Sequence, residues 1–227
     1  GLADGRNYLG NLSLEKETAH KLDLGFVMKG KNWRFMPNIF YTKIDDYILG
    51  LPSNNMPANM IAQMNGIANP LIWQNDEARL VGADFSYAHQ FTPELSLTAT
   101  GQYVRGKQTG SVNQDLYRIA PLSGHVSVKY AAHDYELSAT ATVVSSQSNV
   151  ATLQNETASN GYAVFDVQGA YFFDNGFTLT LLIENLLDKQ YAQHVAGISR
   201  VTSDVYPAGN KQLSPGRNIG AYITYQF

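Results

Sequence analysis

The stretch Ser214-Pro-Gly-Arg-Asn-Ile-Gly-Ala-Tyr-Ile-Thr-Tyr-Gln-Phe227 ends the chain and decides its fold class. Read backwards in steps of two, its apolar residues are Phe227, Tyr225, Ile223, Ala221 and Ile219. The residues between them are mostly polar or small, and this strict period of two predicts a strand with one apolar and one polar face. A strand of about ten residues that ends on an aromatic residue is typical of a tilted strand crossing an outer membrane.

The preceding stretch from Phe177 to Asn185 repeats the pattern, with Leu179, Leu181 and Ile183 on the apolar side. The residues that follow, Asn185-Leu-Leu-Asp188, predict a short helical turn in which the Asn185 side chain accepts a backbone hydrogen bond. Two amphipathic strands joined by a long connection therefore close the chain.

Three short motifs in this region carry a resemblance to a known family. They are Ile183-Glu-Asn-Leu-Leu-Asp-Lys-Gln-Tyr191, Pro215-Gly-Arg217 and the terminal Tyr225-Gln-Phe227. Together they resemble the carboxy-terminal signature of TonB-dependent outer-membrane receptors. The resemblance implies a barrel of about 22 strands whose lumen is plugged by a separate amino-terminal domain.

The rest of the chain alternates in the same way, and nine strand regions are predicted in all. Short turns are predicted near positions 30, 93, 133 and 175, and long polar connections near 60, 110, 152 and 203. Short and long connections alternate without exception, which is the asymmetry of an outer-membrane barrel. The fold class is therefore all-β, an antiparallel transmembrane β-barrel segment of about nine strands from a larger plugged barrel.

The odd number of strands bears on domain organisation. A complete single-chain bacterial barrel has an even number of strands. We therefore expect residues 1–227 to form the carboxy-terminal part of a β-barrel domain, with the plug domain absent from this chain. No signal peptide is recognisable at the start, because residues 1–6 have neither a basic start nor an apolar core.

Composition excludes several other classes of protein. The net charge is −3, so nothing indicates a nucleic-acid partner. The absence of cysteine excludes disulfides and thiolate metal sites, and no apolar run reaches the roughly 18 residues of a transmembrane helix. No catalytic constellation is recognisable and no cofactor is predicted, so we do not expect an enzyme.

One long connection contains a predicted helix with three methionines spaced four residues apart. They share one face and are Met56, Met60 and Met64. Asn54 or Asn55 caps this helix and Pro57 lies in its first turn. The methionine face either packs as a lid against the barrel mouth or binds a soft metal such as Cu(I), joined by His194 from another connection.

The ligand remains open between two classes. The run from His194 to Arg200, with Asp204-Val and the later Pro-Gly-Arg, resembles the copper-receptor branch of the family. A receptor for an iron-siderophore needs aromatic and arginine contacts for a large anionic chelate. The residues that fit this need are Trp73, Tyr191, Arg200 and Tyr206.

The resemblance implies import of a metal or metal chelate across the outer membrane, with membrane lipid, the ligand and the TonB complex as partners. TonB would act through the plug. We also expect Arg105 and Glu184 to line the lumen, and Arg217 to anchor the last strand by ion pairing. Two alternatives stay open: an outer-membrane enzyme whose active site is assembled from distant strands, and a soluble carbohydrate-binding β-protein.

Overall fold

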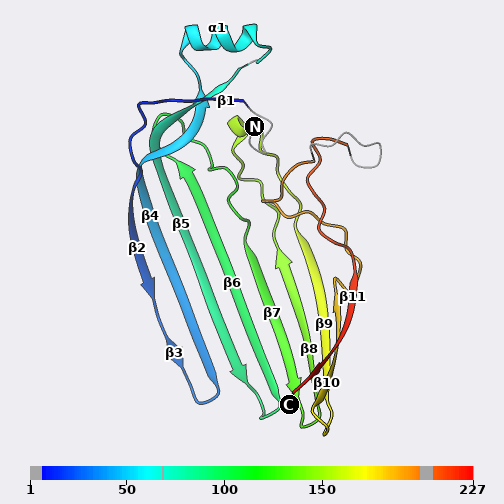
Figure 1. The fold of residues 1–227 in the computed structure, drawn as a ribbon. Helices are drawn as coiled ribbons and strands as arrows, with labels where there is room; N and C mark the ends of the chain where they lie inside the picture. The colour runs from blue at the N-terminus through cyan, green and yellow to red at the C-terminus, as the bar shows by residue number, and fades with distance from the viewer. Residues whose placement is uncertain (1–6, 68, 200–206, 227) are drawn as a thin grey trace.

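A single curved sheet, antiparallel except for one short strand, forms the molecule (Figure 1). The computed structural model describes residues 7–67, 69–199 and 207–226. Strands follow one another around the sheet in the order β11-β10-β9-β8-β7-β6-β5-β4-β2. Their bounds are β2 Thr18–Gly25, β4 Trp33–Pro52, β5 Leu71–Gln90, β6 Leu95–Gln108, β7 Ser123–Ala131, β8 Tyr135–Val144, β9 Tyr162–Phe172, β10 Phe177–Glu184 and β11 Asn218–Tyr225. The nine predicted strands are confirmed.

Four short elements complete the fold. β1 (Tyr8–Leu9) pairs with β5 in parallel, and β3 (Met28–Lys29) pairs with β4. The helix α1 (Met56–Met64) and the 3-10 helix η1 (Thr152–Gln154) lie in two of the long connections. None of the helices in the described ranges is long and apolar enough to cross a membrane.

Connections of different length lie at opposite ends of the sheet (Figure 1). The short ones, at the lower end of the view, cover residues 30–32, 91–94, 132–134 and 173–176. The long ones cover residues 53–70, 109–122, 145–161 and 185–217, and their described parts lie at the upper end. The predicted alternation is confirmed. Three of the long connections, 109–122, 145–161 and 185–217, contact one another through hydrogen bonds to Glu156.

Pairing register separates the two faces of the wall. Leu22, Tyr41 and Val81 are direct partners across β2, β4 and β5, so their side chains share a face. Along β10 and β11 the same face carries Leu181 and Ile223, which are 53% and 67% exposed. Large apolar side chains exposed along a whole sheet face indicate contact with lipid.

Polar side chains fill the opposite face, which lines the lumen. Representative members, one from each of six strands, are Asp84, Gln102, His125, Thr140, Asp166 and Thr224. The buried apolar residues do not lie in the middle of the wall. Most belong to its upper end and to the connections packed there: Leu49, Leu51, Leu71, Leu116 and Ala151.

Aromatic rings mark the short-turn end of the wall. Tyr130 lies 6.0 Å from Tyr135 between ring centroids, and Phe177 lies 4.7 Å from Tyr225. Trp33 begins β4 at the same end. Such a girdle is typical of the level where a barrel passes from hydrocarbon to water.

Two details around the last strands differ from the sequence prediction. Asn185 and Asp188 adopt left-handed backbone conformations, so the segment is a turn and not a helical one, and the Asn185 side chain accepts from Lys189 N at 2.8 Å. Arg217 anchors the start of β11 without an ion pair in the described chain: its backbone N donates to Asp188 Oδ1 at 2.8 Å.

Candidate functional site

The helix α1 projects beyond the upper ends of β4 and β5 (Figure 1). Asn55 caps it, accepting from Ala58 N at 3.1 Å, and Pro57 lies in its first turn, as predicted. The methionine face is open to solvent, with exposed fractions of 68%, 60% and 86% for Met56, Met60 and Met64. No described residue of this chain covers the methionine face, and the choice between a lid and a soft-metal site stays a prediction.

A cavity of about 330 Å³ lies on the lumen side of the wall, where β6 to β9 meet the connection before β11. Its chemically distinctive lining residues are Gln102, His125, Tyr162, Asp166 and Tyr191. Tyr162 and Tyr191 place their rings 4.3 Å apart. His125 Nδ1 lies 2.9 Å from Thr142 Oγ1, and Asp166 accepts from Asn185 N at 2.8 Å. Aromatic faces and polar groups thus converge on one space.

His194 touches this cavity but is engaged in its own hydrogen-bond network. Its side chain is 1% exposed; Nδ1 lies 2.9 Å from Ser159 Oγ, and Nε2 lies 3.1 Å from Glu156 Oε1. Lys211 Nζ donates to the His194 carbonyl oxygen at 3.3 Å. Burial lowers the pKa of His194, the nearby Lys211 charge lowers it further, and Glu156 opposes both. Both ring nitrogens are therefore occupied by protein partners.

Glu156 joins three of the long connections. Besides His194, it accepts from Arg118 N at 2.8 Å and from Ala151 N at 2.7 Å. These donors belong to the connections 109–122, 145–161 and 185–217. A buried carboxylate that receives several charge-assisted hydrogen bonds fixes its donors strongly. Glu156 therefore holds the connections 109–122, 145–161 and 185–217 to one another, and we call these three connections the rim of the wall.

Trp73 lies in a different place from Tyr191. Near the upper end of β5, its ring stacks on Tyr8 at 4.6 Å and 20°. Both rings line a second cavity, of about 220 Å³, together with Tyr47 and Gln154. Of the predicted aromatic and arginine contacts, Trp73 and Tyr191 thus line separate cavities, and Arg200 and Tyr206 lie outside the described residues.

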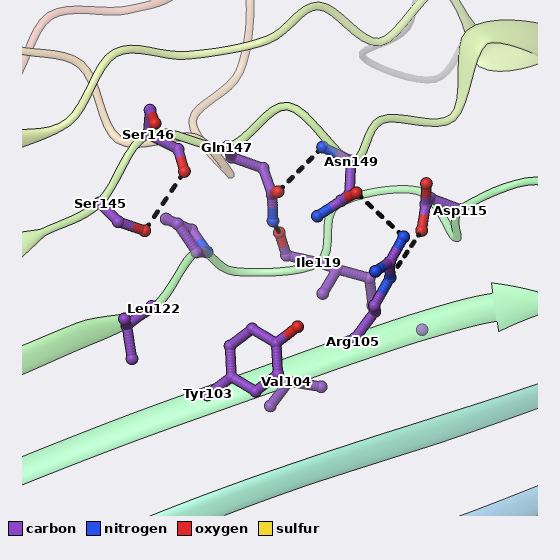
Figure 2. Close-up of a pocket in the computed structure, with 12 residues that line it drawn as sticks. Tyr103, Val104, Arg105, Asp115, Ile119, Leu122, Ser145, Ser146, Gln147 and Asn149 are labelled. Carbon is purple, nitrogen blue, oxygen red and sulfur yellow. Dashed lines mark hydrogen bonds and ion pairs between the residues drawn. The ribbon is translucent and has the colours of Figure 1, made fainter.

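Arg105 does not face the lumen. Its register partner Val81 belongs to the apolar outward face, so the prediction of a lumen position is wrong. Figure 2 shows its guanidinium between two connections: Nε lies 3.3 Å from Asp115 Oδ1, and Nη2 donates to Asn149 Oδ1 at 3.1 Å. The adjoining cavity is only about 70 Å³. Glu184, by contrast, lies on the lumen face and accepts from Asn218.

Sequence reasoning missed the residues that organise the rim, above all Glu156, Ser159 and Lys211. Glu156 and His194 are 38 residues apart, and no spacing motif connects them. No group of three or more His, Cys, Asp or Glu residues within the described ranges is arranged to hold a metal ion. Thioethers are outside that set, so the methionine face stands as a separate candidate.

The sequence matches the family of TonB dependent receptor-like β-barrels over residues 1–186. The chain belongs to this family. No curated protein sequence matches it. Receptors of this family lie in the outer membrane and are transporters and not enzymes, which agrees with the lipid-facing surface of the wall.

Three solved structures illustrate the similarity of fold. The copper transporter OprC matches with a TM-score of 0.79 at 22% identity, over 95% of this chain and 32% of that one. The ferric yersiniabactin uptake receptor FyuA from Yersinia pestis matches with a TM-score of 0.68 at 16% identity, over 93% and 30%. The FrpB iron transporter from Neisseria meningitidis matches with a TM-score of 0.67 at 14% identity, over 99% of this chain and 34% of that one. The chain spans about a third of these receptors' length.

Proposed function

We propose that this chain is the carboxy-terminal sector of a plugged TonB-dependent receptor that imports copper across the outer membrane. The observation that carries the proposal is the methionine face of α1, which is exposed on the long-connection side of the wall. Exposed apolar thioethers gain nothing from hydrophobic packing, whereas thioether sulfur is a ligand suited to Cu(I). The similarity to a copper transporter in fold supports this choice.

In this proposal α1 captures the metal outside the cell, and the lumen wall forms part of the path inward. The TonB complex would act through the plug domain of the full-length receptor. His194 contributes as a structural residue of the rim, since its ring nitrogens already have Glu156 and Ser159 as partners. We therefore assign first capture to Met56, Met60 and Met64 alone.

An iron-siderophore is the second candidate ligand, and one feature favours it. The lumen cavity of about 330 Å³ presents the paired rings of Tyr162 and Tyr191 beside the carboxylate of Asp166. Aromatic faces suit the flat aromatic groups of many chelators, and several solved receptors of similar fold are described as iron or siderophore receptors. In this alternative Trp73 would contribute from the neighbouring rim.

The test measures copper accumulation in cells that carry the full-length receptor with Met56, Met60 and Met64 all changed to Leu. Leu has a helix propensity close to that of Met, so the helix is kept and only the sulfur is lost. We expect accumulation at limiting copper to fall several-fold. As a matched control, Ile61→Leu changes another exposed apolar residue of the same helix and leaves copper accumulation unchanged.

A second variant distinguishes capture from rim structure. His194→Ala removes the rim network and leaves the sulfur atoms in place, so we expect a smaller effect on copper than the triple variant gives. If copper accumulation is insensitive to every one of these changes, and growth under iron limitation depends on the receptor, the copper proposal fails and the siderophore alternative stands.

A further inference from the structure

A row of basic residues crosses four neighbouring strands on the outward face of the wall. Lys43 of β4 is the direct partner of His20 on β2 and of Arg79 on β5, and Arg79 is the direct partner of Lys107 on β6. Side chains of direct partners share a face. Because Tyr41 and Val81, two residues away, belong to the lipid-facing surface, the basic row lies on that same surface.

The level of the row follows from the register. Trp33, at the aromatic end of β4, pairs with His89, and Lys43 pairs with Arg79 on the same two strands. The ten residues from 33 to 43 rise roughly 33 Å along the strand, which is roughly 25 Å across the membrane at a tilt of about 40°. The apolar band of such a barrel is also about 25 Å tall. The row thus lies where hydrocarbon gives way to the headgroups of the outer leaflet.

Two members of the row, Arg79 and Lys107, form no ion pair with a carboxylate in the described part of the chain. Lys43 pairs with Asp45 at 2.7 Å, and His20 lies 3.4 Å from the same carboxylate. Arg79 and Lys107 form no ion pair or side-chain hydrogen bond within the described part of the chain, although they lie directly opposite each other.

Like charges opposite each other on a sheet destabilise it unless an anion lies between them. The carboxylates nearest to the row offset this repulsion only in part, since Glu77 acts on Lys43 and neither Glu77 nor Asp115 forms an ion pair with Arg79 or Lys107. Glu77 is two residues beyond Arg79 toward the long connections, with no cation within ion-pair distance in the described chain. Asp115 is the bridge partner of Lys107, but its carboxylate pairs with Arg105 at 3.3 Å.

We propose that Arg79 and Lys107, flanked by Lys43, bind the phosphate groups of a phosphorylated glycolipid in the outer leaflet. A guanidinium and an ammonium on adjacent strands offer several donors to one phosphate, and such charge-assisted bonds are strong. The site is local to β4–β6. On β8, β9 and β10 the last outward-facing residues before the long connections are uncharged: Val143, Ala163 and Ile183. The proposal depends on the outer-membrane location and not on which metal is imported.

The experiment titrates lipid A, a bis-phosphorylated glycolipid, onto the purified full-length receptor in neutral detergent and counts bound lipids by native mass spectrometry. The test variant carries Arg79→Gln and Lys107→Gln. Each basic side chain near an anionic lipid surface contributes roughly a factor of five, so the affinity should fall about thirtyfold. The variant with Arg79→Lys and Lys107→Arg keeps both charges and should retain most of the binding.

A matched control removes two cations from the other end of the same wall. Lys29 and Lys31 lie at the short turn before β4. The variant that carries both Lys29→Gln and Lys31→Gln should bind lipid A like the unmodified receptor. Heat-induced migration shifts on gels verify that every variant is a folded barrel.

Equal loss of affinity in test and control variants would overturn the proposal, as would unchanged affinity in the test variant. Two competition arms separate the sources of phosphate. If inorganic phosphate at millimolar concentration displaces lipid A, or if phosphatidylglycerol binds equally well, the row is a general anion site and the glycolipid assignment is overturned. Retention of lipid A against both competitors supports it.

Discussion

The wall and its long connections are stabilised in opposite ways. Along β4 and β5 the register runs from Trp33–His89 to Pro52–Leu71 with one irregularity, between Ile44 and Tyr47. Each pair adds a similar small contribution. The connections instead depend on a few polar side chains: Glu156 receives donors from three segments. The stability of the wall is therefore spread over many cross-strand pairs, whereas that of the rim depends on a few polar side chains.

Short and long connections differ in the same respect. The turn at 91–94 is held by its own residues, with Thr92 Oγ1 accepting from Leu95 N at 3.1 Å. The connection 109–122 is held from outside, because Asp76 of β5 accepts from Ser111 N at 2.9 Å. Local turns tolerate changes elsewhere in the chain, whereas each long connection depends on its neighbours. Three changes measure this difference.

The largest effect is expected in the wall, from Leu181→Arg. Leu181 faces outward, is 53% exposed and lies four residues from the aromatic end of β10, near the middle of the apolar band. Arginine there should lower the free energy of unfolding in lipid vesicles by about 2–4 kcal/mol. Thr224→Arg, on the lumen face of β11, should change the free energy of unfolding little. If urea titrations show the same loss of unfolding free energy for both variants, the assignment of the two faces is wrong. Thr180 is unsuitable as this control because it is buried.

An intermediate and local effect is expected from Glu156→Ala. The change leaves the backbone donors of Arg118 and Ala151 and the ring of His194 without their acceptor. The cost is about 1–3 kcal/mol for a buried donor and smaller for the exposed Arg118 N. Hydrogen exchange should accelerate in the connections 109–122 and 145–161, while β7 and β8 keep their protection. Glu94→Ala, in a short turn, should affect that turn alone. If hydrogen exchange instead accelerates equally in all strands of the wall, the rim is not stabilised separately from the wall.

The smallest effect is a pH dependence of the rim. His194 has a pKa lowered from its ordinary value of 6.5 by burial and by Lys211, against the opposing charge of Glu156. The state in which the rim is open and His194 is exposed therefore binds a proton more readily than the closed state. The stability of the rim is greatest above pH 6.5 and decreases as the pH falls below that value. Exchange in 145–161 should therefore accelerate between pH 7.5 and pH 5. His194→Gln should remove this acceleration; an unchanged pH profile in that variant would assign it to another group.

The sequence by itself determined the wall. Period two, turn residues and alternating connection lengths are properties of neighbouring residues, so they predicted nine strands, the orientation of the connections and the cap of α1 at Asn55. Even the outward position of Arg105 follows from its parity with Tyr103. The error lay in assuming that a charge must face the lumen: near the upper end of β6 the outward-facing Arg105 is paired with Asp115 and Asn149 of the long connections.

Only the tertiary structure decided how the rim is built and which charges gather on the wall. Glu156 meets His194 because two connections close over the same strands, and that proximity depends on the path of both connections rather than on any local pattern. The basic row across Lys43, Arg79 and Lys107 likewise requires the register of three strands, since these residues share no spacing along the chain. Periodicity fixes which face a side chain takes; pairing between distant segments fixes its partners.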